Sequence, residues 1–250
     1  MDKRDTLPEI GAAGRALLSK FEFANESRHV REDYELGVLV RFCLAGVDGV
    51  PIARGLLRKL RESIDAHDAR ANDYDDLVRE LFKVHPLEMF DELFVGDEQA
   101  QRRGIRLIEE LMRHNKNPID VVSDDAVITW CSGDPNSRYP LATAAVTLFR
   151  RPNDKSDHEW TPLASKLVRH APEPMAVLDC IIARLHPTSW SGSLAAKLES
   201  RAKLLAQLDV GTNPELTRAV SEARAGLMKD AEACRRAETE EDRARSGRFE

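Results

Sequence analysis

The sequence predicts an all-α protein in which about five antiparallel helix pairs stack as an α-solenoid, with no sheet. Three observations predict this fold class. Apolar residues recur with the 3.6-residue period of a helix, prolines stand between the periodic segments, and helix starts recur about every 40 positions. The chain has 250 residues, 42% of them hydrophobic and 32% charged, so it can bury a core and is too charged for a membrane protein.

Each periodic segment places its apolar side chains on one face of a helix. The segment 36–44, for example, has apolar residues at the i, i+3, i+4, i+7 and i+8 positions. The apolar run 119–122 is too short for a convincing strand and follows Pro118, a residue favoured in the first turn of a helix. The predicted helical segments are, in order, 7–21, 36–44, 56–64, 74–82, 86–94, 105–112, 141–149, 163–168, 178–185 and 194–208.

Five capped helix starts form the repeat. They lie 49, 37, 39 and 40 residues apart, and an amphipathic segment precedes each one. Asp and Asn side chains accept hydrogen bonds from the amide groups of a first helical turn, and Pro fits the same turn. The linker 65–73 and the extra helix 86–94 account for the longer first interval. The five starts are Asp48, Asp97, Asp134, Glu173 and Asn213.

Two of these starts carry a family resemblance. The pattern Asp134-Pro135-x-x-Arg138-x-x-x-Ala142-x-x-Ala145 resembles the second helix of a HEAT unit, and Asn213-Pro214-x-x-x-Arg218-Ala219 is similar. The resemblance to the HEAT and armadillo class covers roughly residues 33–235, although the Glu173 unit lacks the arginine. It implies a solenoid and no particular function. The stretch 187–193 and the closing residues also resemble the ends of large bacterial proteins that carry helical-repeat regions.

The two ends of the chain differ from the repeat. Residues 1–31 hold one apolar helix and a charged connector, and we expect them to cap the first repeat. The helical-repeat domain follows over residues 32–235. Residues 236–250 alternate acidic and basic side chains, which predicts a charged C-terminal tail with a solvated helical extension.

The sequence carries no signature of catalysis, cofactor binding or metal binding. The phosphate-binding patterns G-x-x-x-x-G-K-[ST] and G-x-G-x-x-G are absent, as are C-x-x-C and H-E-x-x-H. Ser193 is better explained as the N-cap of a helix than as a nucleophile. The acidic pairs Asp75-Asp76 and Asp124-Asp125 are better explained as first-turn residues favoured by the helix dipole. We therefore expect no catalytic residue, no cofactor and no metal site.

The cysteines and the hydropathy predict a cytoplasmic protein without membrane contact. Four cysteines lie far apart, and three of them fall inside apolar helical patterns, as expected of reduced, mostly buried thiols. No apolar run reaches the roughly 18 residues of a membrane span, and the first 20 residues lack the apolar core of a signal peptide.

Three tryptophans are candidates for either core or ligand contact. Trp130 lies on the apolar face of its segment, which predicts core packing. Trp160 and Trp190 stand at helix starts, where an indole can cover a junction between repeats. Of these two, Trp190 is the stronger candidate for a surface contact.

A stripe of arginines is the strongest candidate binding surface. Its members lie about 120° from the apolar face on two helices, and in a HEAT-type solenoid they would line the concave side. The alternative is that these arginines pair with acidic residues of neighbouring repeats. The stripe consists of Arg54, Arg58 and Arg61, then Arg102, Arg106 and Arg113, with Arg138 beyond them.

These observations favour a non-catalytic protein-interaction or scaffold module. Arginines bind carboxylates and phosphates alike, so a nucleic-acid-binding protein is the alternative and an unrecognised enzyme the second alternative. The 37 basic and 43 acidic residues give a net charge of −6, which disfavours nucleic acid.

Overall fold

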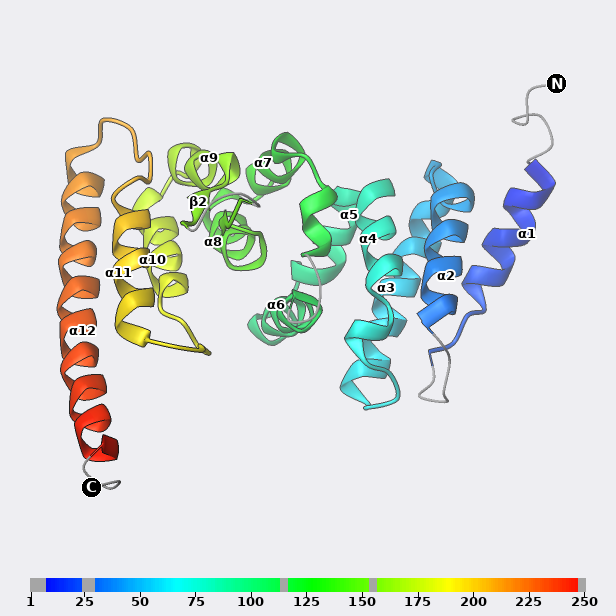
Figure 1. Ribbon diagram of the computed structural model, residues 1–250. Coiled ribbons are helices and arrows are strands. Elements are labelled where there is room, and N and C mark those ends of the chain that lie inside the picture. Colours follow the sequence, from blue (N-terminus) through cyan, green and yellow to red (C-terminus); the bar gives the residue numbers. More distant parts are fainter. Residues whose placement is uncertain (1–7, 24–29, 113–116, 153–156, 247–250) are drawn as a thin grey trace. The chain divides into compact units, whose positions relative to one another are not determined.

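A computed structural model describes residues 8–23, 30–112, 117–152 and 157–246 (Figure 1). The chain divides into two compact units, Met1–Gly133 and Asp134–Glu250, called unit 1 and unit 2 below. The described residues form twelve α-helices, three short 3-10 helices and one pair of two-residue strands. The all-α class is confirmed.

Unit 1 contains seven α-helices. α2 packs against α1 and α4, α3 packs against α1 and α5, and α5 also contacts α4, α6 and α7. The helices are α1 (Pro8–Ser19), α2 (Val30–Cys43), α3 (Val50–Asp65), α4 (Asp75–Val84), α5 (Pro86–Phe94), α6 (Glu98–Met112) and α7 (Asp124–Ser132), with the 3-10 helices η1 (Val47–Gly49), η2 (Ala71–Asp73) and η3 (Pro118–Val121). The extra short helix expected at 86–94 is therefore present, and residues 119–121 lie in the 3-10 helix η3 rather than in a strand.

The core of unit 1 is centred on an aromatic cluster from α4, α5 and α7. The ring centroid of Phe90 lies 5.2 Å from that of Phe82, 6.3 Å from that of Phe94 and 5.1 Å from that of Trp130. Trp130 is buried, and its indole Nε1–H donates a 2.9 Å hydrogen bond to Asp91 Oδ1. The prediction that Trp130 packs in the core is confirmed.

Unit 2 contains five α-helices and the strand pair. α10 contacts all four other helices, and α12 packs mainly against α11. Leu227 and Ala231 of α12 are buried. The elements are α8 (Pro135–Ala145), β1 (Phe149–Arg150), β2 (Glu159–Trp160), α9 (Pro162–His170), α10 (Pro174–Leu185), α11 (Leu194–Leu205) and α12 (Pro214–Ser246).

The five helix starts of the repeat agree with the structure, whereas their capping chemistry agrees only in part. Helices begin at Glu98, Pro135, Pro174 and Pro214, each directly after its predicted start, and α3 begins after the 3-10 turn that contains Asp48. Asp97 Oδ1 accepts a 2.8 Å hydrogen bond from the Ala100 amide, and Asn213 Oδ1 accepts one of 2.9 Å from the Glu215 amide. Asp134 and Glu173 make no such bond.

The predicted helix over 141–149 ends four residues early. α8 stops at Ala145, and Phe149 instead pairs with Trp160 in the antiparallel strands β1 and β2. This ribbon is the one exception among the described residues to the expected absence of a sheet. The two rings stand edge to face with centroids 5.7 Å apart, a contact between strands that helical periodicity does not predict.

Candidate functional site

The arginines of α3 are held by the neighbouring helix α5. Arg58 forms two hydrogen bonds of 2.8 and 2.9 Å with the Glu92 carboxylate, and Arg54 lies 3.5 Å from Asp91 Oδ2. Arg61 Nη1 donates a 3.0 Å bond to the backbone carbonyl of Glu92. The bidentate contact with Glu92 raises the pKa of Arg58. These three guanidinium groups therefore contribute to packing between α3 and α5.

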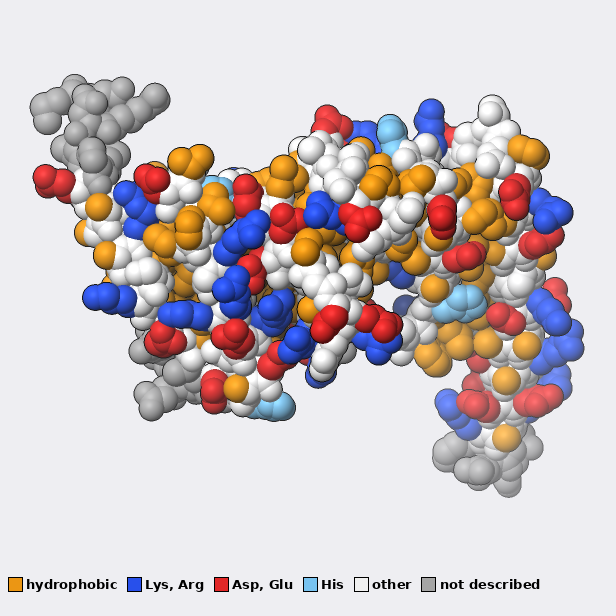
Figure 2. Space-filling model, turned by 180° about the vertical axis from the view of Figure 1, so that it is seen from behind, with side chains coloured by type: hydrophobic (Ala, Val, Ile, Leu, Met, Phe, Trp, Pro, Cys, Tyr) orange, Lys and Arg blue, Asp and Glu red, His pale blue; other side chains and the backbone are white. Residues whose placement is uncertain are grey.

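The remaining arginines of the predicted stripe have separate environments. On α6, Arg102 pairs with Glu98 at 2.5 Å and Arg106 pairs with Glu110 at 3.1 Å, both within one helix. Arg113 lies outside the described residues. Arg138 belongs to α8 of unit 2 and is half-buried. On the face drawn in Figure 2, most Lys and Arg side chains lie beside Asp and Glu side chains.

The other two tryptophan predictions concern unit 2. Trp190 is 52% exposed and lines a groove of about 520 Å³ with residues of α11 and α12. Trp160 is half-buried, and its indole N–H donates a 2.6 Å hydrogen bond to the Leu204 carbonyl. Trp190 is thus available for a surface contact, which stays a prediction.

A basic cleft in unit 1 is the candidate site that the structure adds. It has a volume of about 550 Å³ and lies where the end of α3, the connection through η2 and one face of α6 come together. The ionisable side chains that line it are Arg61, Asp65, His67, Arg70, Arg103, Arg106 and Glu110. We call this feature the α3–α6 cleft.

The connection after α3 gives the cleft its first wall. His67 ends the helix with a φ of 66°, in the left-handed region, and the Ser63 carbonyl accepts the amide groups of Asp68 and Ala69. Ala69 and Ala71 are buried and anchor the connection on either side of Arg70, which is exposed. This alternation of buried and exposed residues places Arg70 at the cleft.

Positive charge predominates in the α3–α6 cleft. Arg103 lies 3.7 Å from Asp65, and Arg106 pairs with Glu110. Arg70 makes no side-chain hydrogen bond or ion pair with any residue that the structure describes. Four arginines therefore face two carboxylates, in a chain whose overall net charge is −6. This arrangement suits an anionic group.

The sequence offered only a partial signal for the α3–α6 cleft. Arg61 and Arg106 were already members of the predicted stripe. Arg70 and Arg103 come from a linker and from a different helix face, and no local spacing relates them to each other. Their proximity depends on how α6 packs beside η2.

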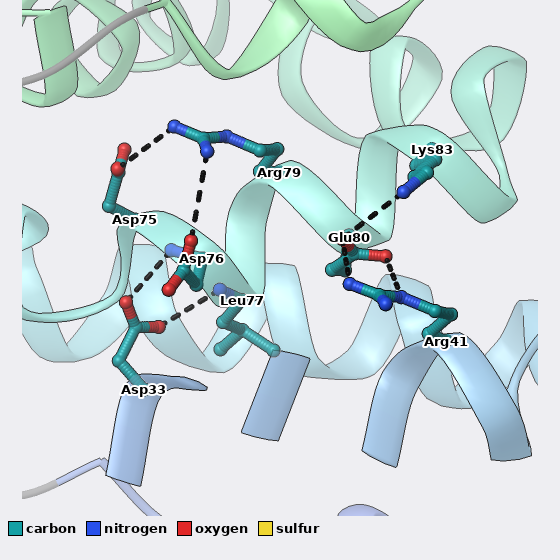
Figure 3. Close-up of polar contacts among 8 residues, drawn as sticks. All are labelled: Asp33, Arg41, Asp75, Asp76, Leu77, Arg79, Glu80 and Lys83. Atoms are coloured by element: carbon teal, nitrogen blue, oxygen red, sulfur yellow. Dashed lines mark hydrogen bonds and ion pairs between the residues drawn. The ribbon is translucent and has the colours of Figure 1, made fainter. Parts of the chain in front are cut away.

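A second polar cluster joins α2 to α4 and is structural. Figure 3 shows the Asp33 carboxylate accepting hydrogen bonds of 2.8 and 2.9 Å from the amide groups of Asp76 and Leu77, in the first turn of α4. Burial raises the pKa of Asp33 to about 6, and the two amide donors act in the opposite direction. Asp75 and Asp76 lie in the first turn of α4, as expected.

The same interface contains an ion pair at its other end. Arg41 donates hydrogen bonds of 2.9 and 2.7 Å to the two oxygens of Glu80, and these bonds lower the pKa of that carboxyl (Figure 3). Each carboxylate of this cluster accepts hydrogen bonds or pairs with an arginine. One of their oxygens, Asp75 Oδ1, is buried and has no hydrogen-bond partner among the described residues.

Comparison with known proteins adds no relative. No family model, curated protein or solved structure matches the chain. Within the described residues, no helix has the length and apolar character needed to cross a membrane, and no three His, Cys, Asp or Glu side chains gather as a metal site.

Proposed function

We propose that this protein is a non-catalytic interaction module that binds an acidic segment of a protein partner in the α3–α6 cleft. The observation that carries the proposal is the excess of guanidinium groups in the cleft, above all Arg70. Arginine binds carboxylates through two parallel hydrogen bonds, which gives such a site both affinity and orientation.

The charges within the cleft suggest how a carboxylate would bind. Arg70 would be the first anchor because it has no acidic partner to exchange. Arg103 lies 3.7 Å from Asp65 and would bind next, by exchanging this long ion pair for a closer one with a carboxylate of the bound segment. The pair of Arg106 with Glu110 is exposed on the arginine side, so it costs little to open.

The same charges favour a short acidic segment over nucleic acid. At physiological salt, charges act over about 8 Å, so a short segment inside the cleft responds mainly to the local arginines. A nucleic acid extends far beyond one cleft and meets a chain with more acidic than basic residues. Arg54 and Arg58 of α3 would not assist, because acidic side chains of α5 pair with them.

The proposed scaffold is a HEAT-like solenoid. The recurrent helix starts support it, as does the packing of α2 on α4 and of α3 on α5 within unit 1. All four cysteines are free, which supports a reducing compartment such as the cytoplasm.

Fluorescence anisotropy with a labelled glutamate-rich peptide tests the proposed cleft. We expect Arg70→Glu to weaken binding at least tenfold, the order expected for a charge-assisted contact replaced by repulsion. Arg102→Glu is the matched control, because Arg102 lies on α6 beside Arg103 and does not line the cleft. Equal affinities for both variants would contradict the proposal.

A labelled DNA duplex measured alongside the peptide tests the alternative. If the duplex binds more tightly than the peptide and its affinity falls with salt at a slope near −0.9 per phosphate contacted, nucleic acid replaces the protein partner.

A further inference from the structure

A second basic cluster lies in unit 2, where the ribbon of β1 and β2 meets α11. The register pairs Phe149 with Trp160, and Arg151 and His158 directly adjoin the two strands at the next position of this register. The ring centroid of His158 lies 5.7 Å from that of Phe149, so the two share a face. This face is turned toward α11, because the Arg201 guanidinium carbon lies 4.0 Å from the centroid of the Phe149 ring.

One face of α11 completes the cluster. Lys197, Arg201 and Leu204 follow the i, i+4, i+7 spacing of a single helix face, and the Leu204 carbonyl accepts the indole N–H of Trp160. The ribbon and α11 therefore bring Lys197 and Arg201 close to Arg151 and His158. We call these four residues the ribbon–α11 cluster.

Two buried polar atoms of the ribbon–α11 cluster have no hydrogen-bond partner among the described residues. They are Arg201 Nη1 and His158 Nδ1. A buried polar atom without a hydrogen-bond partner costs free energy, and a bound group that reached it would recover part of that cost. Burial lowers the pKa of His158, and the nearby positive charges of Arg201, Arg151 and Lys197 lower it further.

The geometry points to a binding site for a phosphate group at the ribbon–α11 cluster. Among the described residues, the charges that act on His158 are those of three cations, Arg201, Arg151 and Lys197, and of one carboxylate, Asp157, an excess that suits a doubly charged group. Donors from the ribbon and from the helix approach from different sides, as the oxygens of a tetrahedral anion require, whereas a planar carboxylate has two oxygens to offer. This site lies in unit 2 and does not depend on the proposed function of the α3–α6 cleft.

The experiment is a titration of the full chain with inorganic phosphate, followed by NMR of the His158 ring and compared with potassium chloride at equal ionic strength. We expect a saturable shift of the His158 signals and a rise in the pKa of His158, because a bound anion favours the imidazolium form. Lys197→Gln and Arg151→Gln should each raise the Kd about tenfold, the order of one hydrogen bond to a charged group.

Lys203→Gln is the matched control, since Lys203 is exposed on α11 about 200° around the helix from Arg201. Phosphoserine peptides and their unphosphorylated forms separate a phosphorylated protein from free phosphate as the source of the group. A shift no larger than that in chloride, or one of equal size and affinity in Lys197→Gln and Lys203→Gln, overturns the proposal.

Discussion

Two helix N-termini, one in each unit, are capped by a carboxylate from a distant helix. In unit 1, Asp33 of α2 accepts the amide groups of Asp76 and Leu77 at the start of α4. In unit 2, Glu238 of α12 accepts the amide groups of Leu194 and Ala195 at the start of α11, at 2.7 and 3.2 Å. Both satisfy amide groups that a helix leaves without partners.

The two carboxylates have pKa values that shift in opposite directions. Burial raises the pKa of Asp33 to about 6 even though both its oxygens accept amide hydrogen bonds. Hydrogen bonds, first from the Ser193 hydroxyl and then from the backbone, lower the pKa of the partly exposed Glu238. The hydrogen bonds act to lower the pKa of both carboxylates, and burial outweighs them at Asp33 but not at Glu238.

We expect the largest loss of stability from truncation of buried apolar side chains. This loss of unfolding free energy is the reference for the effects of the two caps. Ile181 and Leu148 are 0% and 1% exposed, so replacing either by Ala should lower the free energy of unfolding by about 2–5 kcal/mol through lost burial and a cavity. Urea unfolding followed by tryptophan fluorescence measures the change. Met228→Ala, at an exposed site of α12, is the control, and similar losses in all three variants would contradict the assigned core.

The two caps also show which parts of the fold a sequence can predict. The Ser193 cap was predicted because Ser193 directly precedes the helix that begins at Leu194, and the structure confirms it: Ser193 Oγ accepts a 3.0 Å hydrogen bond from the Ala196 amide. Asp33 and Glu238 lie more than 40 residues from the amides that they cap, so no local pattern could reveal them. Periodicity predicted ten of the twelve helices, but five of its segments begin four to seven residues after the helix does. It also extended the helix of Leu148 through residues that pair as strands.

The same limit applies to the candidate sites. Spacing alone placed Arg54, Arg58 and Arg61 on one face of α3, and the structure confirms that they share a neighbour. Spacing could not show that α5 supplies a carboxylate to Arg54 and to Arg58 and a backbone carbonyl to Arg61. Only the tertiary structure identifies Arg70 and Arg201 as candidate binding residues. The Arg70 side chain makes no hydrogen bond or ion pair with a described residue, and Arg201 Nη1 makes no hydrogen bond with one.

Removal of the Asp33 side chain should lower the free energy of unfolding more than removal of the Glu238 side chain. Asp33→Ala leaves two amide groups at a buried helix start without their acceptor and should lower the free energy of unfolding by about 1–3 kcal/mol at pH 7. Urea unfolding measures this loss. An unchanged free energy would show that α4 does not need the cap.

The pH dependence of that stability is part of the same prediction. Because the pKa of Asp33 is raised in the folded state, the part of the stability that depends on its protonation is full below the ordinary value of 3.8 and is lost as the pH rises through about 6. The hydrogen bonds from the two amide groups remain at pH 7, and their loss is what Asp33→Ala measures. The amide introduced by Asp33→Asn does not titrate. Between pH 4 and 7 the free energy of unfolding should therefore fall less in Asp33→Asn than in the parent chain. A larger fall in the free energy of unfolding in Asp33→Asn would mean that the pKa of Asp33 is lowered, not raised, in the folded state.

Loss of the Glu238 side chain should have the smallest effect, and its pH dependence should have the opposite sign. The pKa of Glu238 is lowered in the folded state, so its contribution is present above the ordinary value of 4.5 and is lost as the pH falls through the lowered pKa.

Ser193 still caps the Ala196 amide in Glu238→Ala, and water can reach the two amides that lose their acceptor. The effect should therefore be local: faster amide hydrogen exchange at Leu194 and Ala195 at neutral pH, with global stability nearly unchanged. Glu240→Ala, two residues further along α12 and fully outside this contact, is the control. Unchanged exchange at both amides in Glu238→Ala would mean that the exposed cap does not hold in solution, and only the buried cap of unit 1 would then join distant helices.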